Sequence, residues 1–235
     1  MNVLIDPRFC GPPASGNGGY SCGLLAQHLP GSVEVTLKAP PPLGVDLQID
    51  VSGHAARMTC DGQVIAEARV IDADWPAPPP RPDFEAAVLA ATRYAGFRRH
   101  DYPTCFACGP DRAEHDGLRI FSGPWRDGIV AAPWIADDSL ADAQGTLPVP
   151  VLWAAIDCAG YWAATAGLDP GPAMLLGRMS ARFDGSVRAG ERCIVSGWTL
   201  GVDGRKHRAG TALFGADGRC VGQSRQTWIA LKGER

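Results

Sequence analysis

The sequence predicts an α+β fold built from two tandem repeats, each with one long helix wrapped by an antiparallel sheet. Residues 60–70 and 216–226 each place an Asp-Gly pair before an extended run, which is a strong hairpin signal. Upstream of each, residues 40–53 and 185–198 hold a turn glycine followed by another extended run. The repeated order favours duplication over the alternative, a single α+β sandwich with an incidental repeat.

Each half also has one apolar segment with helical spacing. In the first half, apolar residues recur at this spacing from Tyr20 to Leu29, directly after a glycine-rich stretch. In the second half, an apolar stripe runs from Val151 to Ala163. We therefore expect one long helix in each repeat.

Further elements are expected between these two helices. Residues 84–96 predict an additional helix that joins the halves, with Asp83 as its N-cap. Residues 117–121 and 128–135 predict strands that precede the second long helix. Only residues 1–6 occupy the corresponding place before the first long helix.

A proline-rich stretch, residues 72–84, marks the boundary between the halves. Prolines at this density are excluded from helix interiors and central strands. We assign residues 1–71 to an N-terminal half, 72–100 to the linker and connecting helix, and 101–235 to a C-terminal half.

Composition excludes several classes of partner. The chain has 235 residues, 46% of them hydrophobic, and a formal net charge of -3. Its longest basic run is Arg98, Arg99 and His100, so we expect no binding to nucleic acid or to an anionic membrane surface. The N-terminus lacks an export signal, and no window approaches the roughly 18 apolar residues of a membrane span. We expect a cytoplasmic protein.

The chain has eight cysteines, and they are spread along it rather than clustered as in a small secreted domain. Only Cys105 and Cys108 have a chemically meaningful spacing, that of half a zinc site or of a redox pair. The nearby histidines are His100 and His115. We favour a turn with packed thiols and expect no metal, although zinc binding by this pair stays open.

Three stretches of the sequence resemble hotdog-fold acyl-CoA thioesterases of the phenylacetate and mitochondrial-type group. They are CFACGP with DGLRIF (105–121), GNGGYSCGLLA (16–26) and PVPVLWAAID (148–157). The resemblance implies a double hotdog, in which the two halves form the pseudo-dimer that most hotdog proteins form from two chains. It implies an acyl-CoA thioester as substrate, with coenzyme A as part of the substrate and no other cofactor.

The resemblance also implies where the site lies. In the family, an aspartate follows the first position of a His-Gly-Gly motif by nine residues, and faces the helix N-terminus of the other subunit. Nine residues after Asn17 stands Ala26, and nine residues before Asp157 stands Pro148. The first half thus keeps the glycines and the second half keeps the acid. One composite site is implied, formed by Asn17, Gly18 and Gly19 together with Asp157.

Asp157 is unusual without any family. It is the only charged residue between Asp142 and Asp169, within a predicted helix whose same face carries Trp153 and Tyr161. Apolar surroundings disfavour the charged carboxylate, so we expect its pKa to be raised. Asp157 would act as general base or as nucleophile, and the sequence does not separate the two. The alternative is a buried aspartate satisfied by a local partner.

The glycine pair suits a developing oxyanion. The N–H groups of Gly18 and Gly19 lie at a predicted helix start, where a thioester carbonyl could approach without a Cβ in the way. Asn17 would donate to the same oxygen or only cap the helix. Tyr20 is expected to line the pocket with Trp153 and Tyr161. A plain turn is the alternative for the glycines.

A nucleotide-binding loop is excluded, because the glycine-rich stretch lacks the Gly-Lys-Ser/Thr ending and a βαβ context. Thioester hydrolysis is our first hypothesis. The alternative is a non-catalytic protein that binds acyl-CoA or a small ligand at a degenerate hotdog site. A hydratase is third, because it needs a histidine paired with an acid, and His28, the only histidine of the predicted helices, lies about three turns past Asn17. Lys38, Arg178 and Arg182 are candidate contacts for coenzyme A phosphates. The acyl group and any homodimer of pseudo-dimers stay open.

Overall fold

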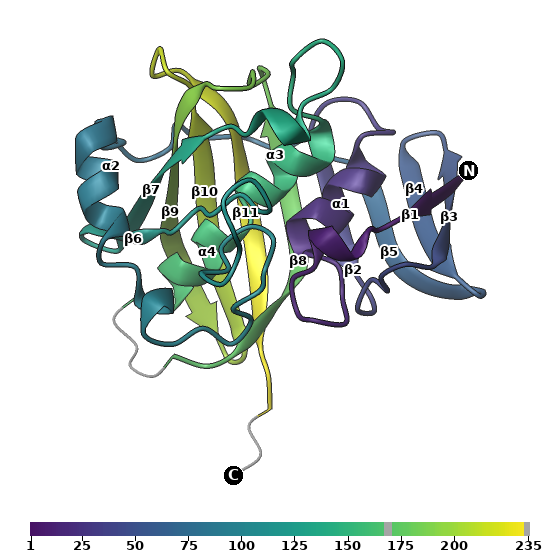
Figure 1. Cartoon of the computed structure of the whole chain (residues 1–235). Coiled ribbons are helices and arrows are strands. Elements are labelled where there is room, and N and C mark those ends of the chain that lie inside the picture. The colour runs from purple at the N-terminus through teal and green to yellow at the C-terminus, as the bar shows by residue number, and fades with distance from the viewer. Residues whose placement is uncertain (167–170, 233–235) are drawn as a thin grey trace.

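One large antiparallel sheet forms the framework of the molecule. The computed structural model describes residues 1–166 and 171–232, so residues 167–170 and 233–235 of the predicted C-terminal half fall outside the described residues. Eleven strands from the described residues form the sheet, in the order β1-β3-β4-β5-β2-β8-β11-β10-β9-β7-β6. Figure 1 shows α1, α3 and α4 lying together against the sheet and α2 standing at its β6–β7 end.

The strands are β1 (Asn2–Leu4), β2 (Val33–Leu37), β3 (Asp46–Ser52), β4 (Ala55–Cys60), β5 (Gln63–Val70), β6 (Gly123–Arg126), β7 (Ile129–Ile135), β8 (Met174–Phe183), β9 (Arg192–Asp203), β10 (Lys206–Phe214) and β11 (Cys220–Ala230). The α-helices are α1 (Gly18–Ala26), α2 (Phe84–Ala91), α3 (Val149–Ala155) and α4 (Cys158–Ala164). Short 3-10 turns include Pro7–Phe9, Ala95–Phe97 and Asp138–Leu140.

The strand order is the same when read outward in either direction from the centre. One side runs β2, β5, β4, β3, β1, and the other runs β8, β11, β10, β9, β7, with β6 added at the outer edge. At the centre, β2 pairs with β8 in antiparallel fashion, so that Val33 lies opposite Ala181 and Thr36 opposite Arg178. The two parts of the chain therefore share one continuous sheet.

The predicted hairpins are confirmed. Asp61 and Gly62 adopt φ values of 47° and 79° between β4 and β5, as a tight hairpin turn requires. Gly44 and Gly190 also have positive φ and lie just before β3 and β9. Glycine tolerates this conformation because it has no Cβ.

The predicted strand at 117–121 is wrong. The segment has no strand pairing; instead, Leu118 N–H donates to Phe106 O at 2.8 Å and Ile120 N–H donates to Ala107 O at 2.9 Å. Arg119 between them adopts a φ of 53°, which interrupts an extended run. The segment therefore packs on the loop that carries Cys105 rather than joining the sheet. The strand expected at 128–135 is confirmed as β7.

Helix α2 begins where Asp83 was expected to cap it, with the Asp83 carboxylate accepting from Ala86 N–H. The helix ends at Ala91, short of the predicted 96. It packs on a small separate cluster that includes Ile194 and Phe214. Side chains alternate between faces along a strand, and Cys193 and Leu213 belong to the main core. Helix α2 therefore covers the sheet face opposite to the main core.

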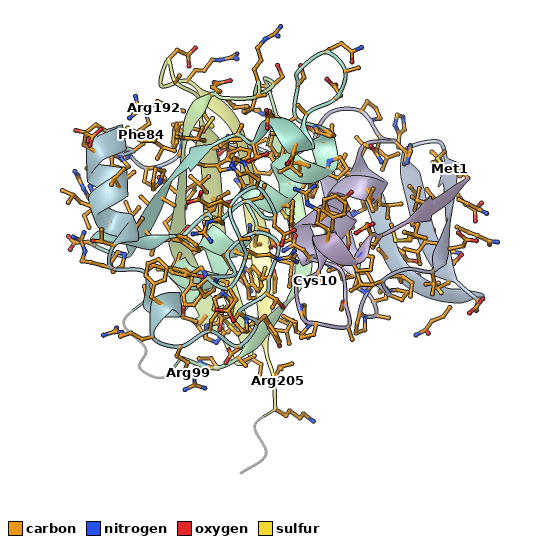
Figure 2. All side chains as sticks on the ribbon, in the orientation of Figure 1. Met1, Cys10, Phe84, Arg99, Arg192 and Arg205 are labelled. Atoms are coloured by element: carbon orange, nitrogen blue, oxygen red, sulfur yellow. The ribbon has the colours of Figure 1, made fainter. Side chains whose placement is uncertain are left out.

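A cation–aromatic contact adds to this packing at the first turn of α2. The Arg192 guanidinium of β9 lies 3.9 Å from the centroid of the Phe84 ring, and the two labelled side chains are neighbours in Figure 2.

Candidate functional site

Helices α1 and α3 approach so closely that only glycine fits at two positions of α1. A Cβ at Gly19 would lie 2.6 Å from both Trp153 O and Asp157 Cβ, and a Cβ at Gly23 would lie 2.6 Å from Pro150 Cα. One end of α1 therefore meets the end of α3, and the other end meets its beginning. This antiparallel contact brings the start of α1 against Asp157.

The second predicted helix is broken at Asp157. The carbonyl oxygen of Ile156 accepts hydrogen bonds from Thr211 Oγ1 at 2.8 Å and Gln226 Nε2 at 2.7 Å. In a continuous helix this oxygen would accept from Gly160 N–H, which here donates to Asp157 O at 3.0 Å. Two strands thus hold the carbonyl that the helix would have used, and α3 and α4 become separate helices.

The expectation that Asp157 lies within one continuous helix is wrong for this reason. Asp157 occupies the N-cap position of α4, although its side chain makes no cap hydrogen bond. Trp153 and Asp157 nevertheless both face α1, since a Cβ at Gly23 would meet the first and a Cβ at Gly19 would meet the second. Sequence reasoning missed Thr211 and Gln226, since nothing near 157 signals their donors.

The carboxylate of Asp157 is buried and half satisfied. Its Oδ2 accepts from Asn17 Nδ2 and from Gly19 N–H, both at 3.0 Å. Its Oδ1 has no hydrogen-bond partner among the described residues, and the side chain is 1% exposed. Burial raises the pKa of Asp157 to about 7, and the bonds from Gly19 and Asn17 oppose that rise.

The Asn17 side chain caps helix α1 and also donates a hydrogen bond to Asp157. Its Oδ1 accepts from Tyr20 N–H at 2.9 Å, which caps α1, while its Nδ2 donates to Asp157. The predicted pair of oxyanion donors is divided: Gly19 N–H is bound by Asp157, whereas Gly18 N–H has no hydrogen-bond partner in the described ranges.

A cavity of about 470 Å³ lies at this junction. Its wall comes from both parts of the chain: the loop before α1, the end of β2 with the residues up to 41, parts of residues 100–108, the start of α4 and the start of β8. Asn17, Gly18, Asp157 and Tyr161 all belong to this wall. Most of the lining is apolar, so the cavity suits an apolar group with a polar head at Asp157.

The other predicted lining residues lie elsewhere. Tyr20 stacks on Phe9 with ring centroids 4.0 Å apart, outside the cavity wall. Trp153 is 2% exposed and packs against Gly23, also outside the wall.

One of the three candidate cations lines the cavity. Lys38 does so, and its Nζ lies 3.1 Å from Glu67. Arg178 and Arg182 do not line this cavity; Arg178 hydrogen-bonds to Thr36 and Arg182 pairs with Asp184 at 2.9 Å. His28 is also absent from the cavity wall.

Three buried thiols stand beside Asp157. The sulfur atoms of Cys105, Cys108 and Cys158 all lie within 4.8 Å of one another. The pKa of Cys105 is well below its usual range, mainly because hydrogen bonds from the Cys108 and Cys158 side chains favour the thiolate. Sequence reasoning missed Cys158, which is 50 residues further along the chain than Cys108.

Solved structures resemble this one over nearly the whole chain. The tesB protein of Mycobacterium avium subspecies paratuberculosis aligns with a TM-score of 0.64 and 14% identity, over 98% of this chain and 92% of that one. An acyl-CoA thioesterase II of Mycobacterium marinum aligns with a TM-score of 0.64 and 11% identity, over 99% and 93%.

A protein from Alicyclobacillus acidocaldarius described as having a hotdog fold aligns with a TM-score of 0.56 and 11% identity, over 99% of this chain and 93% of that one. The chain has a hotdog fold. This architecture confirms the hotdog fold that the resemblance implied. No family profile matches the sequence, and neither does any curated protein. Within the described part of this hotdog protein, no helix is long and apolar enough to cross a membrane.

Proposed function

We propose that the protein hydrolyses an acyl thioester, such as an acyl-CoA, at a single composite site between two tandem hotdog halves. The observation that carries this proposal is the carboxylate of Asp157. It comes from the second half, is held by Asn17 and Gly19 of the first half, and borders a cavity lined by both halves.

The mirrored strand order supports the two halves as repeats. Under this pairing α1 corresponds to α3, and the site has a counterpart at the other end of the helix pair. There Ala26 stands in place of an acid, and Pro148, Val149 and Pro150 stand in place of the motif with glycines. The counterpart lacks both the acid and the glycine amides, so hydrolysis takes place at one site.

The thioester carbonyl oxygen would accept a hydrogen bond from Gly18 N–H, which lines the cavity. One such donor typically lowers the barrier by about 3 kcal/mol. Asp157 takes a proton from a water molecule as the water oxygen bonds to the carbonyl carbon. The tetrahedral intermediate then collapses, the C–S bond breaks, and the proton on Asp157 passes to the leaving thiolate.

The nucleophilic route uses the same residues. Asp157 Oδ1 attacks the carbonyl carbon, and the thiolate leaves. Water then attacks the Asp157 carboxyl carbon of the resulting mixed anhydride, which releases the acid and regenerates Asp157. A single turnover in ¹⁸O-water with excess enzyme separates the routes. Label in the peptide that contains Asp157 identifies the nucleophile, whereas label only in the acid product supports the general base.

The central test is Asp157→Asn, measured on a panel of acyl-CoA thioesters. Asparagine can still accept from Asn17 and Gly19, so the fold should persist. We expect hydrolysis to fall by at least about 100-fold, the usual contribution of a positioned base. Asp111→Asn, at an exposed aspartate, is the matched control and should keep full activity. Unchanged turnover in Asp157→Asn would exclude the proposal.

A second candidate function is binding of an acyl-CoA without hydrolysis. The 1% exposure of Asp157 favours it, since a buried carboxylate has little room for an attacking water. A melting temperature that rises with acyl-CoA concentration, without release of free thiol, would support this function over hydrolysis.

A further inference from the structure

We propose that Cys105, Cys108 and Cys158 bind one zinc ion, with a fourth coordination position that opens on the cavity beside Asp157. This goes beyond hydrolysis and does not depend on it. It also departs from the expectation that Cys105 and Cys108 are packed thiols without a metal. The structure supplies the third thiol, Cys158, at the first residue of α4.

The sulfur positions fit a tetrahedral ion. Zinc–sulfur bonds of about 2.3 Å at tetrahedral angles place two sulfur atoms about 3.8 Å apart. Cys105 Sγ and Cys158 Sγ are 3.7 Å apart, and Cys108 Sγ lies within 4.8 Å of both. A disulfide needs about 2.05 Å, and all three cysteines are free. Three buried soft ligands that converge in this way suit zinc.

His100 acts as a hydrogen-bond donor to the cluster rather than as a zinc ligand. Its Nδ1 accepts from Tyr102 N–H at 3.0 Å, which places the proton of a neutral ring on Nε2. That nitrogen lies 3.3 Å from Cys108 Sγ and therefore donates to the sulfur. A donor of this kind stabilises a zinc-bound thiolate from outside the ligand set.

Further donors converge on Cys105. The Nδ2 of Asn17 lies 3.7 Å from Cys105 Sγ and 4.0 Å from Cys158 Sγ, while it also serves Asp157. The thiol of Cys158 lies 3.7 Å from Cys105 Sγ and is a further donor to it. A neutral thiol is a weak acceptor, so this many donors suit a permanent thiolate. Zinc with three thiolates has a charge of −1, which these donors help to accommodate.

The fourth position faces the cavity, because all three cysteines belong to its wall. Among the described residues, no fourth His, Cys, Asp or Glu joins the group. A water or a thiolate from the cavity would complete the tetrahedron. The ion would tie the loop with Cys105 and Cys108 to the start of α4, one residue from Asp157.

Metal content of the purified full-length chain tests the proposal directly. Protein loaded with excess zinc and then dialysed against metal-free buffer should retain one zinc ion per chain by mass spectrometry. In the wild type, cobalt(II) should give sulfur-to-cobalt charge-transfer bands with the intensity of three thiolates, and zinc should remove them. Zinc content below about a tenth per chain, together with no thiolate–cobalt bands, would overturn the proposal.

Variants locate the ion. Cys158→Ser should abolish stoichiometric zinc, whereas Cys193→Ser, at a buried cysteine of β9 outside the cluster, should keep it. His115→Asn controls for the exposed group of His115, Asp137 and Asp138 and should also keep it. Zinc that persists in Cys158→Ser but disappears in His115→Asn would place the ion elsewhere and overturn the assignment.

His100→Gln distinguishes donor from ligand. If His100 is a donor outside the ligand set, its substitution should weaken zinc affinity by about 10–100-fold and leave one zinc ion bound per chain. Complete loss of zinc in His100→Gln would contradict the three-thiolate set. Asp157→Asn should still bind zinc, so failure of the hydrolysis proposal and failure of the zinc proposal are separately visible.

Discussion

Asn17 and Asp157 are 140 residues apart in the sequence, and the Asn17 side chain donates a 3.0 Å hydrogen bond to the Asp157 carboxylate in the interior. The same asparagine caps α1 through its other side-chain atom. The start of one helix and the acid at the start of another are thereby held by one side chain. Substitutions at Asn17 can separate these two roles.

Asn17→Ala removes the capping oxygen and the donor, whereas Asn17→Ser keeps an oxygen able to cap. Since loss of a cap typically costs about 1 kcal/mol, the alanine variant should be less stable than the serine variant by that amount. Urea unfolding followed by circular dichroism measures both. Equal free energies of unfolding would show that the cap contributes nothing.

Gly19→Ala should destabilise the fold by about 1–3 kcal/mol, because its Cβ would meet the Trp153 carbonyl and Asp157 at 2.6 Å and force α1 and α3 apart. Gly18→Ala is the matched control. The nearest atoms to its Cβ would belong to the Leu176 side chain, at 2.9 Å and beyond, rather than to backbone, so its cost should be smaller. Thermal and urea unfolding of the two variants check the order, and a more damaging Gly18→Ala would contradict the close helix contact.

Gln226→Met removes one of the two donors to Ile156 O and leaves Trp228 Nε1 without its acceptor. A buried polar group left unpaired costs about 1–3 kcal/mol, and the helix break that positions Asp157 should loosen. We expect a lower free energy of unfolding together with reduced thioester hydrolysis.

Gln223→Met is the control for that substitution. Gln223 lies on the same strand, is also buried, and its side chain forms no hydrogen bond with the described residues. If both variants lose stability and activity equally, the hydrogen bonds of Gln226 do not explain the loss.

The exposed pair of His115 and Asp137 should make stability depend on pH. The hydrogen bond that His115 donates to Asp137, and then the Asp137 charge, raise the pKa of His115. Desolvation raises the pKa of Asp137, but hydrogen bonds from Ser139 and His115 outweigh it and lower the pKa overall. The pair therefore stabilises the folded state fully between about pH 4 and about pH 6.5, which are the pKa values of Asp and His in the unfolded chain. It fades above this window as His115 loses its proton, and below it as Asp137 gains one.

His115→Asn tests this window, since asparagine tolerates the positive φ of 65° at this position. The melting-temperature difference from the wild type should be larger at pH 5.5 than at pH 8.5. The same difference at both values would show that the pair does not titrate as described.

Local signals in the sequence predicted most of the sheet. Asp-Gly turns and turn glycines predicted hairpins because glycine at positive φ is required wherever a strand reverses tightly. The helix that follows Asn17 was predicted from its apolar spacing, and Asp157 from its place as a lone charge in an apolar segment; the family resemblance added that the two meet in one site. That contact is present in the structure, where the backbone nitrogen of Gly19 lies 3.0 Å from Asp157 Oδ2.

Features that depend on distant residues were not predictable. The break at Ile156 arises from donors on β10 and β11, and an apolar helical pattern contains no trace of them. In the sequence, Cys158 is indistinguishable from a small apolar residue of a helix, because its neighbour Cys105 is brought to it only by folding. The segment 117–121 has the composition of a strand, but the loop at Phe106 and Ala107 takes its backbone hydrogen bonds.

The central pairing of β2 with β8 has a consequence for synthesis. A ribosome makes residues 33–37 well before residues 174–183, and at about 5–20 residues per second the delay is roughly 7–30 s. During that interval the nascent chain has a β2 edge without its partner. Unpaired edges accept strands from other chains, so crowded polysomes expose the first half to mispairing with its neighbours. A chaperone bound to that edge would act before the rest of the sheet exists.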